Sequence, residues 1–328
     1  MTNPASQPAP VQPRRVFMVL SPRSLVYARY ALESLFRNAA ELLHVHLITD
    51  SPADRQQLTE ELSASQQTGR HQWSVYAEDD LEDMEASFFA RFPNLRLFRK
   101  GHPCWRKITD PVLLSAPGEE MILLDPDLYF PNRFRFEPTL NRGLLLMWQK
   151  PNCLLPPETV LKAMQEKIHL AHHVDIGVAH WRGPVDLQWI EWLLQKLDCR
   201  NLPRLMHIEA IVWAALAMRM GGGHLDPAYW HCWHRSQATR LMLKLGTTGP
   251  RILRSEPFHG MKCFHAGGEA KYWLAEAKQE GLLDGGKAQI EHGHVVPFTE
   301  LTPSHYRRQQ SVKRWLARLG YYNVFQPV

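Results

Sequence analysis

The chain has 328 residues, 45% of them hydrophobic, which is enough to bury a large core in one α/β domain or in two smaller ones. No apolar run approaches the ~18 residues that a membrane span needs, and the first residues lack the apolar segment of a signal peptide. The formal charge of +5 is modest for this length and no nucleic-acid motif is present, so we expect no nucleic-acid partner.

Strands and helices alternate along the N-terminal part of the chain. Residues 1–14 are rich in Pro, Ala, Gln and Ser, a composition typical of a disordered tail. Hydrophobic periodicity then predicts strands over residues 15–20, 45–49 and 73–76, and helices over residues 27–38, 54–62 and 81–91. Such alternation is typical of βαβ units, so we expect a mainly parallel sheet covered by helices.

The most informative segment is an apolar run that ends in two carboxylates. Residues 121–124 are all apolar, and Asp125, Pro126 and Asp127 follow them. A run of this kind is typical of a strand buried on both faces, and ligands gather beyond the carboxyl ends of such strands. Mn²⁺ and Mg²⁺ are commonly held by carboxylates together with substrate phosphates. Asp125 and Asp127 are therefore candidate metal ligands, and they indicate a nucleotide-diphosphate substrate.

Chance could also produce this pair, because 33 acidic residues in 328 give about three acid-x-acid pairs by composition alone. Most such pairs lie on solvated helix faces, as we expect for the acids between residues 78 and 83. The pair at 125 and 127 lies instead between an apolar strand and the turn-forming Pro131 and Asn132, and this context favours metal or diphosphate binding.

A helix predicted over residues 105–114 precedes the acidic strand. Arg106 and Lys107 lie near its start, where they could face the same end of the sheet as the acidic pair and complement phosphate. Ordinary surface charge explains them equally well, so both interpretations stay open.

The following segments continue the alternation, with strands over residues 143–148 and 173–180 and helices over residues 157–169, 185–197 and 206–220. Asp175 lies on the face of its strand opposite the apolar side chains, and Gly177 would let a ligand or another backbone approach closely. Glu209 lies in the first turn of the last helix, where the helix dipole favours a carboxylate with or without a function. Residues 221–261 are the least regular, and we expect loops over a site there.

A second group of polar residues follows an apolar segment near the C-terminal side. His265, Gly268, Lys271 and Trp273 recur at fixed intervals. An imidazole can supply a third metal ligand, the Gly267–Gly268 pair lets backbone amides approach a phosphate, and Lys271 can neutralise a diphosphate. Because the chain has 17 histidines, His265 alone would more often be structural, and the spacing is what draws attention to it.

Together with the Asp125-Pro126-Asp127 turn, this pattern resembles the glycosyltransferase family that contains glycogenin and the bacterial lipopolysaccharide galactosyltransferases. Those enzymes carry a D-x-D metal motif and, later, H-x-x-G-x-x-K-x-W. Tyr27, Ser34, Leu35 and Asn38 are similar to the pattern of the family's first helix, and residues 174–178 are similar to its N-x-G-V strand.

The resemblance implies a single α/β domain with the GT-A fold, the Rossmann-like fold of nucleotide-diphospho-sugar transferases, with a mainly parallel central sheet. This domain would span residues 15–280. The tail of residues 1–14 would precede it, and a basic and aromatic extension of residues 281–328 would follow.

The resemblance also implies a metal-dependent glycosyltransferase of polysaccharide biosynthesis, which moves a sugar from a nucleotide-diphosphate sugar to a glycan or glycolipid. Retention of the anomeric configuration is the family expectation. The expected ligands of Mn²⁺ (or Mg²⁺) are Asp125, Asp127 and His265. The expected diphosphate-binding residues are Gly268 and Lys271, with Arg106 and Lys107 as further candidates, and the expected catalytic residues, facing the donor sugar or acceptor, are Asp175 and Glu209.

Three positions depart from the family pattern. Ser21-Pro22-Arg23 stands where the family usually has an aspartate near the nucleobase. Asp175 replaces the usual asparagine, and His207-Ile208-Glu209 stands where the family tends to carry a Gln-Asp pair. These departures leave the nucleobase, the sugar and the stereochemistry open.

A cytoplasmic location is expected, because the five cysteines are scattered and form no C-x-x-C pair. The C-terminal stretch from His305 to Tyr322 mixes basic and aromatic residues. It could be a peripheral anchor at the inner face of a membrane, or a solvated helix that packs Trp315, Leu316 and Leu319 on the domain.

Three other functions compete with the transferase. A nucleotidyltransferase would share the sheet, the nucleotide and the metal, but no Gly-rich phosphate loop follows the first strand. A non-catalytic sugar-nucleotide binder stays open if the departures have removed activity. A histidine-rich metal-binding protein could use His169, His172, His173, His224, His231 and His234, although their spacings match no recognised zinc site.

Overall fold

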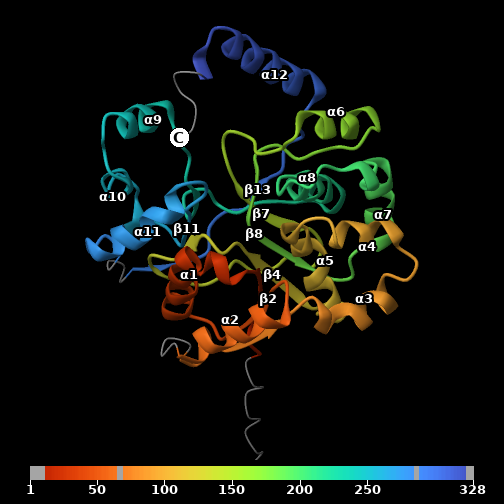
Figure 1. The fold of residues 1–328 in the computed structure, drawn as a ribbon, viewed down its shortest axis with the longest axis horizontal. Coiled ribbons are helices and arrows are strands. Elements are labelled where there is room, and N and C mark those ends of the chain that lie inside the picture. The colour runs from red at the N-terminus through yellow and green to blue at the C-terminus, as the bar shows by residue number, and fades with distance from the viewer. Residues whose placement is uncertain (1–11, 65–68, 284–287, 323–328) are drawn as a thin grey trace, which may run out of the picture.

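The computed structural model describes residues 12–64, 69–283 and 288–322, and its centre is an eight-stranded sheet (Figure 1). The strand order is β13-β9-β7-β8-β4-β1-β2-β3. β8 runs antiparallel to both neighbours and β13 antiparallel to β9, whereas the other pairs are parallel. The expected α/β architecture with a mainly parallel sheet is confirmed. The strands are β1 (Arg14–Val19), β2 (Leu43–Ile48), β3 (Gln72–Tyr76), β4 (Glu120–Leu124), β7 (Leu144–Trp148), β8 (Val174–Arg182), β9 (Gly222–His224) and β13 (Val296–Pro297).

Helices cover both faces of the sheet, because the central strands are apolar on both sides. In β1, Phe17 packs into one hydrophobic cluster, whereas its neighbours Val16 and Met18 pack into a second, and all three are fully buried. This division follows from the two-residue period of a strand. The helices on the Phe17 side are α4 (Pro93–Arg99), α5 (Arg106–Leu113), α7 (Leu187–Lys196) and α8 (Ile208–Met220), and those on the other side are α1 (Leu25–Asn38) and α2 (Pro52–Ala64).

A second, three-stranded sheet joins segments that are far apart in the sequence. It contains β5 (Leu128–Tyr129), β10 (Trp230–Cys232) and β11 (Cys263–His265), with β11 in the middle. β11 pairs antiparallel with β5, so that His265 stands opposite Leu128, one residue after the acidic turn. The two sequence motifs are therefore brought together by a backbone ladder.

The first long helix holds the segment after the acidic turn in place. The Ser34 hydroxyl accepts a hydrogen bond from the backbone N–H of Phe130 at 3.1 Å, and Asn38 Nδ2 donates to the carbonyl of the same residue at 2.5 Å. Both α1 side chains are buried. Two residues of the first-helix pattern thus satisfy the backbone of Phe130 and fix the direction in which the chain leaves the site.

Several predicted elements differ from the observed ones. The helix predicted over residues 81–91 is shorter, as α3 (Glu82–Phe88), and a new helix, α4, begins at Pro93, because proline at the first helical position starts a fresh turn. The least regular region, residues 221–261, contains β9, β10, α9 (Gln237–Lys244) and α10 (Gly249–Leu253) in addition to loops. The helix predicted over residues 157–169 ends early, as α6 (Pro157–Gln165).

The segment after residue 280 contributes to the core of the molecule. β13 pairs with β9 at the edge of the central sheet, and Leu301 and Tyr306 are each 2% exposed within the cluster on the Phe17 side. The final helix, α12 (Pro303–Arg318), holds Tyr306 against the domain but leaves Trp315 60% and Leu319 63% exposed. Of the two alternatives for this stretch, the one in which Trp315 and Leu319 pack on the domain does not agree with this exposure. No helix among the described residues has the length and apolar character needed to cross a membrane. Most of the expected N-terminal tail, residues 1–11, lies outside the described residues.

Candidate functional site

The acidic turn lies at the carboxyl end of β4, held by backbone hydrogen bonds on both sides. The N–H of Asp125 donates to the carbonyl of Gly177 at 2.8 Å, and the carbonyl of Asp127 accepts from the N–H of Ala266 at 2.9 Å. The first bond ties the turn to β8 and the second ties it to the residue after β11. Asp125 and Asp127 therefore have a fixed backbone, which fixes where their carboxylates point.

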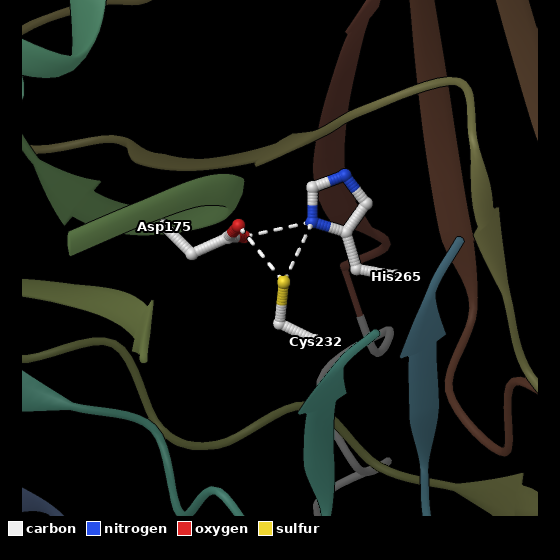
Figure 2. Close-up of side chains that lie close together, drawn as sticks. All are labelled: Asp175, Cys232 and His265. Carbon is white, nitrogen blue, oxygen red and sulfur yellow. Dashed lines mark hydrogen bonds and ion pairs between the residues drawn. The ribbon is translucent and has the colours of Figure 1, made fainter. Parts of the chain in front are cut away.

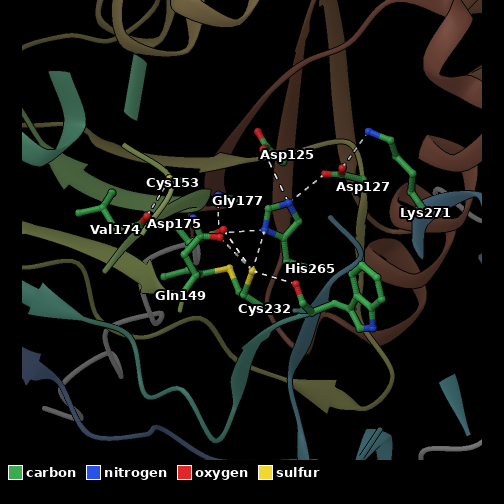
Figure 3. A network of polar contacts seen from close by, with 12 residues as sticks. Asp125, Asp127, Gln149, Cys153, Val174, Asp175, Gly177, Cys232, His265 and Lys271 are labelled. Carbon is green, nitrogen blue, oxygen red and sulfur yellow. Dashed lines mark hydrogen bonds and ion pairs between the residues drawn. The ribbon is translucent and has the colours of Figure 1, made fainter. Parts of the chain in front are cut away.

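His265 lies between the acidic turn and β8 (Figure 3). Its Nε2 atom is 3.2 Å from Asp127 Oδ1 and 4.0 Å from Asp125 Oδ2. One ligand atom from each of these three side chains lies within 4.8 Å of the others, and each residue is only 8% exposed. The three residues proposed as metal ligands from the sequence thus meet at one point.

Asp175 lies on the opposite side of the imidazole. Its Oδ1 atom is 2.9 Å from His265 Nδ1 and also accepts a hydrogen bond from the N–H of Gly177 at 2.8 Å. A Cβ atom at Gly177 would lie 2.6 Å from His265 Nδ1, so glycine is needed for the imidazole to reach this position. The sequence suggested that a ligand or another backbone approaches Gly177, whereas the structure places the His265 ring there.

These pairings shift the pKa values of all three groups. Burial alone would lower the pKa of His265, but Asp175 and Asp127 on its two sides outweigh burial and raise this pKa well above its ordinary value. Burial would raise the pKa values of Asp127 and Asp175, but the pairing with His265 outweighs it and lowers both. Both carboxylates are therefore ionised at neutral pH.

Lys107 joins Asp125 to Glu209 at the base of the site. Its ammonium donates to Glu209 Oε1 at 2.9 Å and lies 2.5 Å from Asp125 Oδ1, without the alignment of a hydrogen bond to the latter. Burial would lower the pKa of Lys107, but the two carboxylates raise it well above its ordinary value. Burial raises the pKa of Glu209 to about 8 even though Lys107 acts in the opposite direction, and burial also raises that of Asp125. One lysine thus pairs with two carboxyl groups, and the structure places Lys107 and Glu209 beside Asp125.

Lys271 approaches the acidic turn from the first turn of α11 (Ala270–Gln279). Its Nζ atom is 3.3 Å from Asp127 Oδ2 and 4.8 Å from the centre of the Tyr27 ring. A cation at this end of a helix is disfavoured by the helix dipole, so Asp127 and Tyr27 account for its position. Gly268 precedes α11 with φ +64°, a conformation that favours glycine.

Two other residues singled out in the sequence have their own partners. Arg106 donates to the carbonyl of Thr49 at 2.8 Å and pairs with Asp50, so its guanidinium lies at the carboxyl end of β2 and away from the acidic turn. Trp273 packs edge-to-face on Trp233, with ring centres 5.3 Å apart. The tryptophan of the second motif therefore stabilises the packing around α11.

Cys232 is a residue of the site that the sequence did not indicate (Figure 2). Its Sγ atom is 3.3 Å from Asp175 Oδ2 and 3.8 Å from His265 Nδ1. Cys232 stands beside His265 because β10 and β11 pair in parallel with these two residues in register. Since only that pairing brings them together, no spacing in the sequence could have found it.

Cys232, Asp175 and His265 form a second group that could hold a metal ion. Burial raises the pKa of the Cys232 thiol to about 12, so the sulfur is neutral and acts as a hydrogen-bond donor. Gln149 adds to this network: with its amide nitrogen toward Asp175 Oδ2, at 3.0 Å, both ends of the amide are satisfied. We interpret this side of the imidazole as a hydrogen-bonded support for His265 and the other side as the metal-binding side.

The residues on that other side suit a divalent cation. They offer two carboxylates and an imidazole nitrogen, with one ligand atom of each within 4.8 Å of the others. Asp175 fixes the ring through Nδ1 and leaves Nε2 facing the acids, an arrangement common among metal-ligating histidines. Oxygen-rich donor sets of this kind suit Mg²⁺ and Mn²⁺ better than soft metals.

The histidine-rich alternative gains no support within the described part of the chain. The two groups of close ligand atoms found there both use His265, and neither contains a residue of the set considered for that alternative. His172 and His173 stack on each other, with ring centres 3.7 Å apart.

No protein-family model matches the chain, and no curated protein matches it significantly. Among solved structures it is similar to mouse xyloside xylosyltransferase 1 in its apo form, at 12% identity and a TM-score of 0.48, over 79% of this chain and 99% of that one. It is similar to the galactosyltransferase LgtC in complex with donor and acceptor sugar analogues, at 12% identity and a TM-score of 0.42, over 83% and 96%. A third match is the glycosyltransferase GlyE of Streptococcus pneumoniae TIGR4, at 11% identity and a TM-score of 0.40, over 77% of this chain and 54% of that one. The names of all three describe glycosyltransferases.

Proposed function

We propose that this protein is a metal-dependent glycosyltransferase that transfers a sugar from a nucleotide-diphosphate sugar to a glycan or glycolipid in polysaccharide biosynthesis. One observation carries the proposal: ligand atoms of Asp125, Asp127 and His265 lie within 4.8 Å of one another. They belong to the two motifs that resemble the family, and Lys271, 144 positions after Asp127, lies 3.3 Å from its carboxylate. The three candidate metal ligands and a lysine suited to a diphosphate therefore lie together.

Each of these residues would have a separate task. Asp125, Asp127 and His265 would hold Mn²⁺ or Mg²⁺, which supplies a Lewis acid for the negative charge that develops on the diphosphate as the glycosidic bond breaks. Lys271 and the backbone N–H of Gly268 would bind the same diphosphate. Because these groups are fixed before the substrate arrives, they need no costly rearrangement during the reaction.

The remaining basic residues would act at a greater distance from the donor. Lys107 is shared between Asp125 and Glu209, so its task would be to hold the Asp125 carboxylate in place. Arg106, paired with Asp50 beyond the end of β2, could reach a nucleotide only by exchanging that partner.

Asp175 and Glu209 differ in how many of their carboxylate oxygens already have a hydrogen-bond partner. Both carboxylate oxygens of Asp175 already face His265, Gly177 or Cys232, which favours a positioning role for Asp175. Glu209 Oε1 is bound to Lys107, whereas its buried Oε2 atom has no hydrogen-bond partner in the described segments. Glu209 therefore keeps an oxygen for a further partner, but its side chain is 0% exposed, so contact with the donor sugar or acceptor would require the site to open.

The test is a panel of UDP-, GDP-, ADP- and TDP-sugars, assayed for hydrolysis and transfer with Mn²⁺, with Mg²⁺ and with EDTA. We expect turnover of at least one donor that stops with EDTA. Asp127→Asn should lower that turnover at least about 100-fold, because it removes a ligand charge from the metal. The matched control is Asp83→Asn, since Asp83 is exposed on α3. NMR of the anomeric proton in the product tests the expected retention of configuration.

Each outcome of the panel decides between functions. Binding of a sugar nucleotide without turnover would replace the transferase by a non-catalytic binder. Absence of both binding and turnover with metal present would overturn the proposal, as would an Asp127→Asn variant that stays fully active.

We also propose that α12 makes peripheral contact with an anionic membrane surface, which would place the protein at the inner face of the membrane in the cytoplasm. Val312, Trp315 and Leu319 are 50%, 60% and 63% exposed, and basic side chains surround them. The variant Trp315→Ser/Leu319→Ser should lose most of its binding to vesicles that contain anionic lipid, the kind of surface that attracts basic segments. The substitution spares the buried Tyr306, which a deletion of the helix would remove. Equal sedimentation of the variant and the natural chain with vesicles would overturn this contact.

A further inference from the structure

A large cavity lies beside the candidate metal site, on the side of His265 that faces away from the acidic turn. Its volume is about 910 Å³, within the range of small-molecule sites of roughly 300–1,000 Å³. Cys232 lines this cavity, and its Sγ atom is 3.3 Å from Asp175 and 3.8 Å from His265. Cys232 therefore belongs both to the lining of the cavity and to the group of side chains that supports His265.

Basic side chains from separate elements line this cavity. Lys150 follows β7, Arg235 follows β10, Arg240 belongs to α9 and Lys313 belongs to α12. In Figure 1, α9 and α12 lie at the same end of the molecule. Cations contributed by distant segments repel one another, so their convergence costs stability unless an anion binds among them.

Carboxylates pair with part of this lining. Glu256 lines the cavity and pairs with His231 at 3.1 Å, and Arg235 pairs with Glu269 at 2.9 Å. Lys150 and Lys313 are both exposed, and no ion pair of either is found within the described residues. The lining therefore has an excess of positive charge.

Aromatic rings complete the lining. Trp148 precedes Lys150 at the end of β7, and Tyr321 and Tyr322 follow α12, with their ring centres 5.4 Å apart. All three side chains are half-buried. Such side chains combine an apolar ring with a polar tip, a combination that suits the apolar faces and hydroxyl groups of a sugar.

We propose that this cavity binds the acceptor, and that the acceptor is a glycan that carries negative charge, as phosphate or carboxylate. The term acceptor rests on the proposed glycosyltransferase function, whereas the preference for a charged sugar rests on the cavity alone. Lysine and arginine side chains make stronger hydrogen bonds to an ionised oxygen than to a hydroxyl group, so charge would dominate selection here.

The test compares sugars that differ in charge, with the full chain in EDTA so that a metal ion contributes nothing. Mannose 6-phosphate, glucuronic acid and neutral mannose are titrated against the protein by ligand-observed NMR. We expect at least one charged sugar to bind at least tenfold more tightly than mannose. A preference for mannose 6-phosphate would identify phosphate as the recognised group, and a preference for glucuronic acid would identify carboxylate.

Charge reversals locate the binding. Lys150→Glu and Lys313→Glu should each weaken binding of the charged sugar at least fivefold. Arg142→Glu is the matched control. Arg142 is exposed and precedes the first residue of β7, whereas Lys150 follows its last residue, so this variant should change the affinity less than twofold. Circular dichroism and thermal unfolding establish that each variant is folded. Equal affinity for charged and neutral sugars, absence of binding by both charged sugars, or unchanged affinity in both lysine variants would overturn the proposal.

The two proposals can fail separately. Metal-dependent hydrolysis of a sugar nucleotide by the natural chain, with no acceptor present, tests the transferase without the cavity. Binding of a charged sugar in EDTA tests the cavity without the transferase. Hydrolysis without charged-sugar binding would leave a transferase whose acceptor is neutral, whereas the reverse would leave an anion-binding cavity on a protein of another function.

Discussion

At the scale of single residues, the candidate metal site depends on the absence of a Cβ atom at Gly177. The His265 ring occupies the space that a side chain at this position would need, since a Cβ atom would lie 2.6 Å from Nδ1 and 2.9 Å from Asp175 Oδ1. Real Cβ atoms do not approach other atoms so closely. The identity of residue 177 therefore decides whether His265 can face Asp125 and Asp127.

Gly177→Ala should displace the His265 ring and weaken Mn²⁺ binding at least tenfold, as measured by isothermal titration calorimetry. Loss of a supporting contact to a metal-ligating histidine typically costs about 10–100-fold in metal affinity. The control is Gly260→Ala, because a Cβ there would meet no atom within 4 Å. If Gly177→Ala bound Mn²⁺ as the natural chain does, His265 would not be a ligand in the position described.

A buried histidine outside the site makes the stability depend on pH. His46 in β2 is 3% exposed, and neither ring nitrogen has a hydrogen-bond partner in the described parts of the chain. Burial, followed by the nearby His44 and Arg15, lowers the pKa of His46 to about 3. The unfolded chain takes up this proton below pH ~6.5, whereas the folded chain does so only near pH 3, so the free energy of unfolding falls as the pH falls between these values.

His46→Phe should remove that dependence. Each pKa unit corresponds to about 1.4 kcal/mol, so the natural chain should lose roughly 2 kcal/mol through this group between pH 7 and pH 5. In urea unfolding, the free energy of unfolding should fall less between pH 7 and pH 5 in the variant than in the natural chain, by about that amount. The exposed His292→Phe serves as the control. An equal difference in His46→Phe and in the natural chain would mean that another group carries the pH dependence.

At the scale of elements, the long strands and helices were predictable, and the short strands of the site were not. Apolar periodicity found β1, β4 and β8, because each is buried on both faces. β5 has two residues and β11 has three, and these short strands are held by pairing with each other and, for β11, with β10. The family resemblance implied that Asp127 and His265 meet, and the pairing of β5 with β11 brings them together, whereas the pairing of β10 with β11 adds Cys232.

Helix α11 allows the role of Lys271 to be tested against a lysine of the same helix. Lys271→Ala should lower kcat/KM for the sugar nucleotide about 100-fold, the usual effect of removing one preorganised donor to a developing charge, while Mn²⁺ binding changes little. Lys278→Ala is the matched control, because Lys278 pairs with Glu33 at 2.6 Å and not with the acidic turn. Steady-state kinetics that gave the same values for both variants would remove Lys271 from the diphosphate site.

At the scale of the whole molecule, the site lies where the α/β architecture leads one to expect it. Asp125 follows β4, and Asp50, the partner of Arg106, follows β2 at the same end of the sheet. Ligands bind in open α/β sheets beyond the carboxyl ends of the strands. The direction of β8, which runs antiparallel to β4, was less predictable. The carbonyl of Gly177 in β8 accepts a hydrogen bond from the N–H of Asp125 and so holds the acidic turn.

The large cavity could not be predicted from the sequence for a related reason. Lys150 and Lys313 are more than 160 residues apart, and their approach depends on how α12 is placed against the domain. The sequence showed that the C-terminal stretch is basic, but not which part of the molecule its basic side chains face. The buried Tyr306 fixes how α12 lies on the domain, and Lys313 then lines the cavity.

Strand β13 has a consequence for how the chain behaves when it is shortened. Val296 and Pro297 occupy the edge of the central sheet beside β9, so removal of residues after 280 would uncover the backbone N–H and carbonyl groups of β9. An uncovered edge is a template for a strand from another molecule. A chain that ends at residue 280 should therefore self-associate with increasing concentration in light scattering, whereas a chain that ends at residue 308, which keeps β13 and Tyr306, should match the full chain. Equal scattering by both shortened chains would contradict this. The C-terminal segment thus protects the sheet from strand addition by a second molecule.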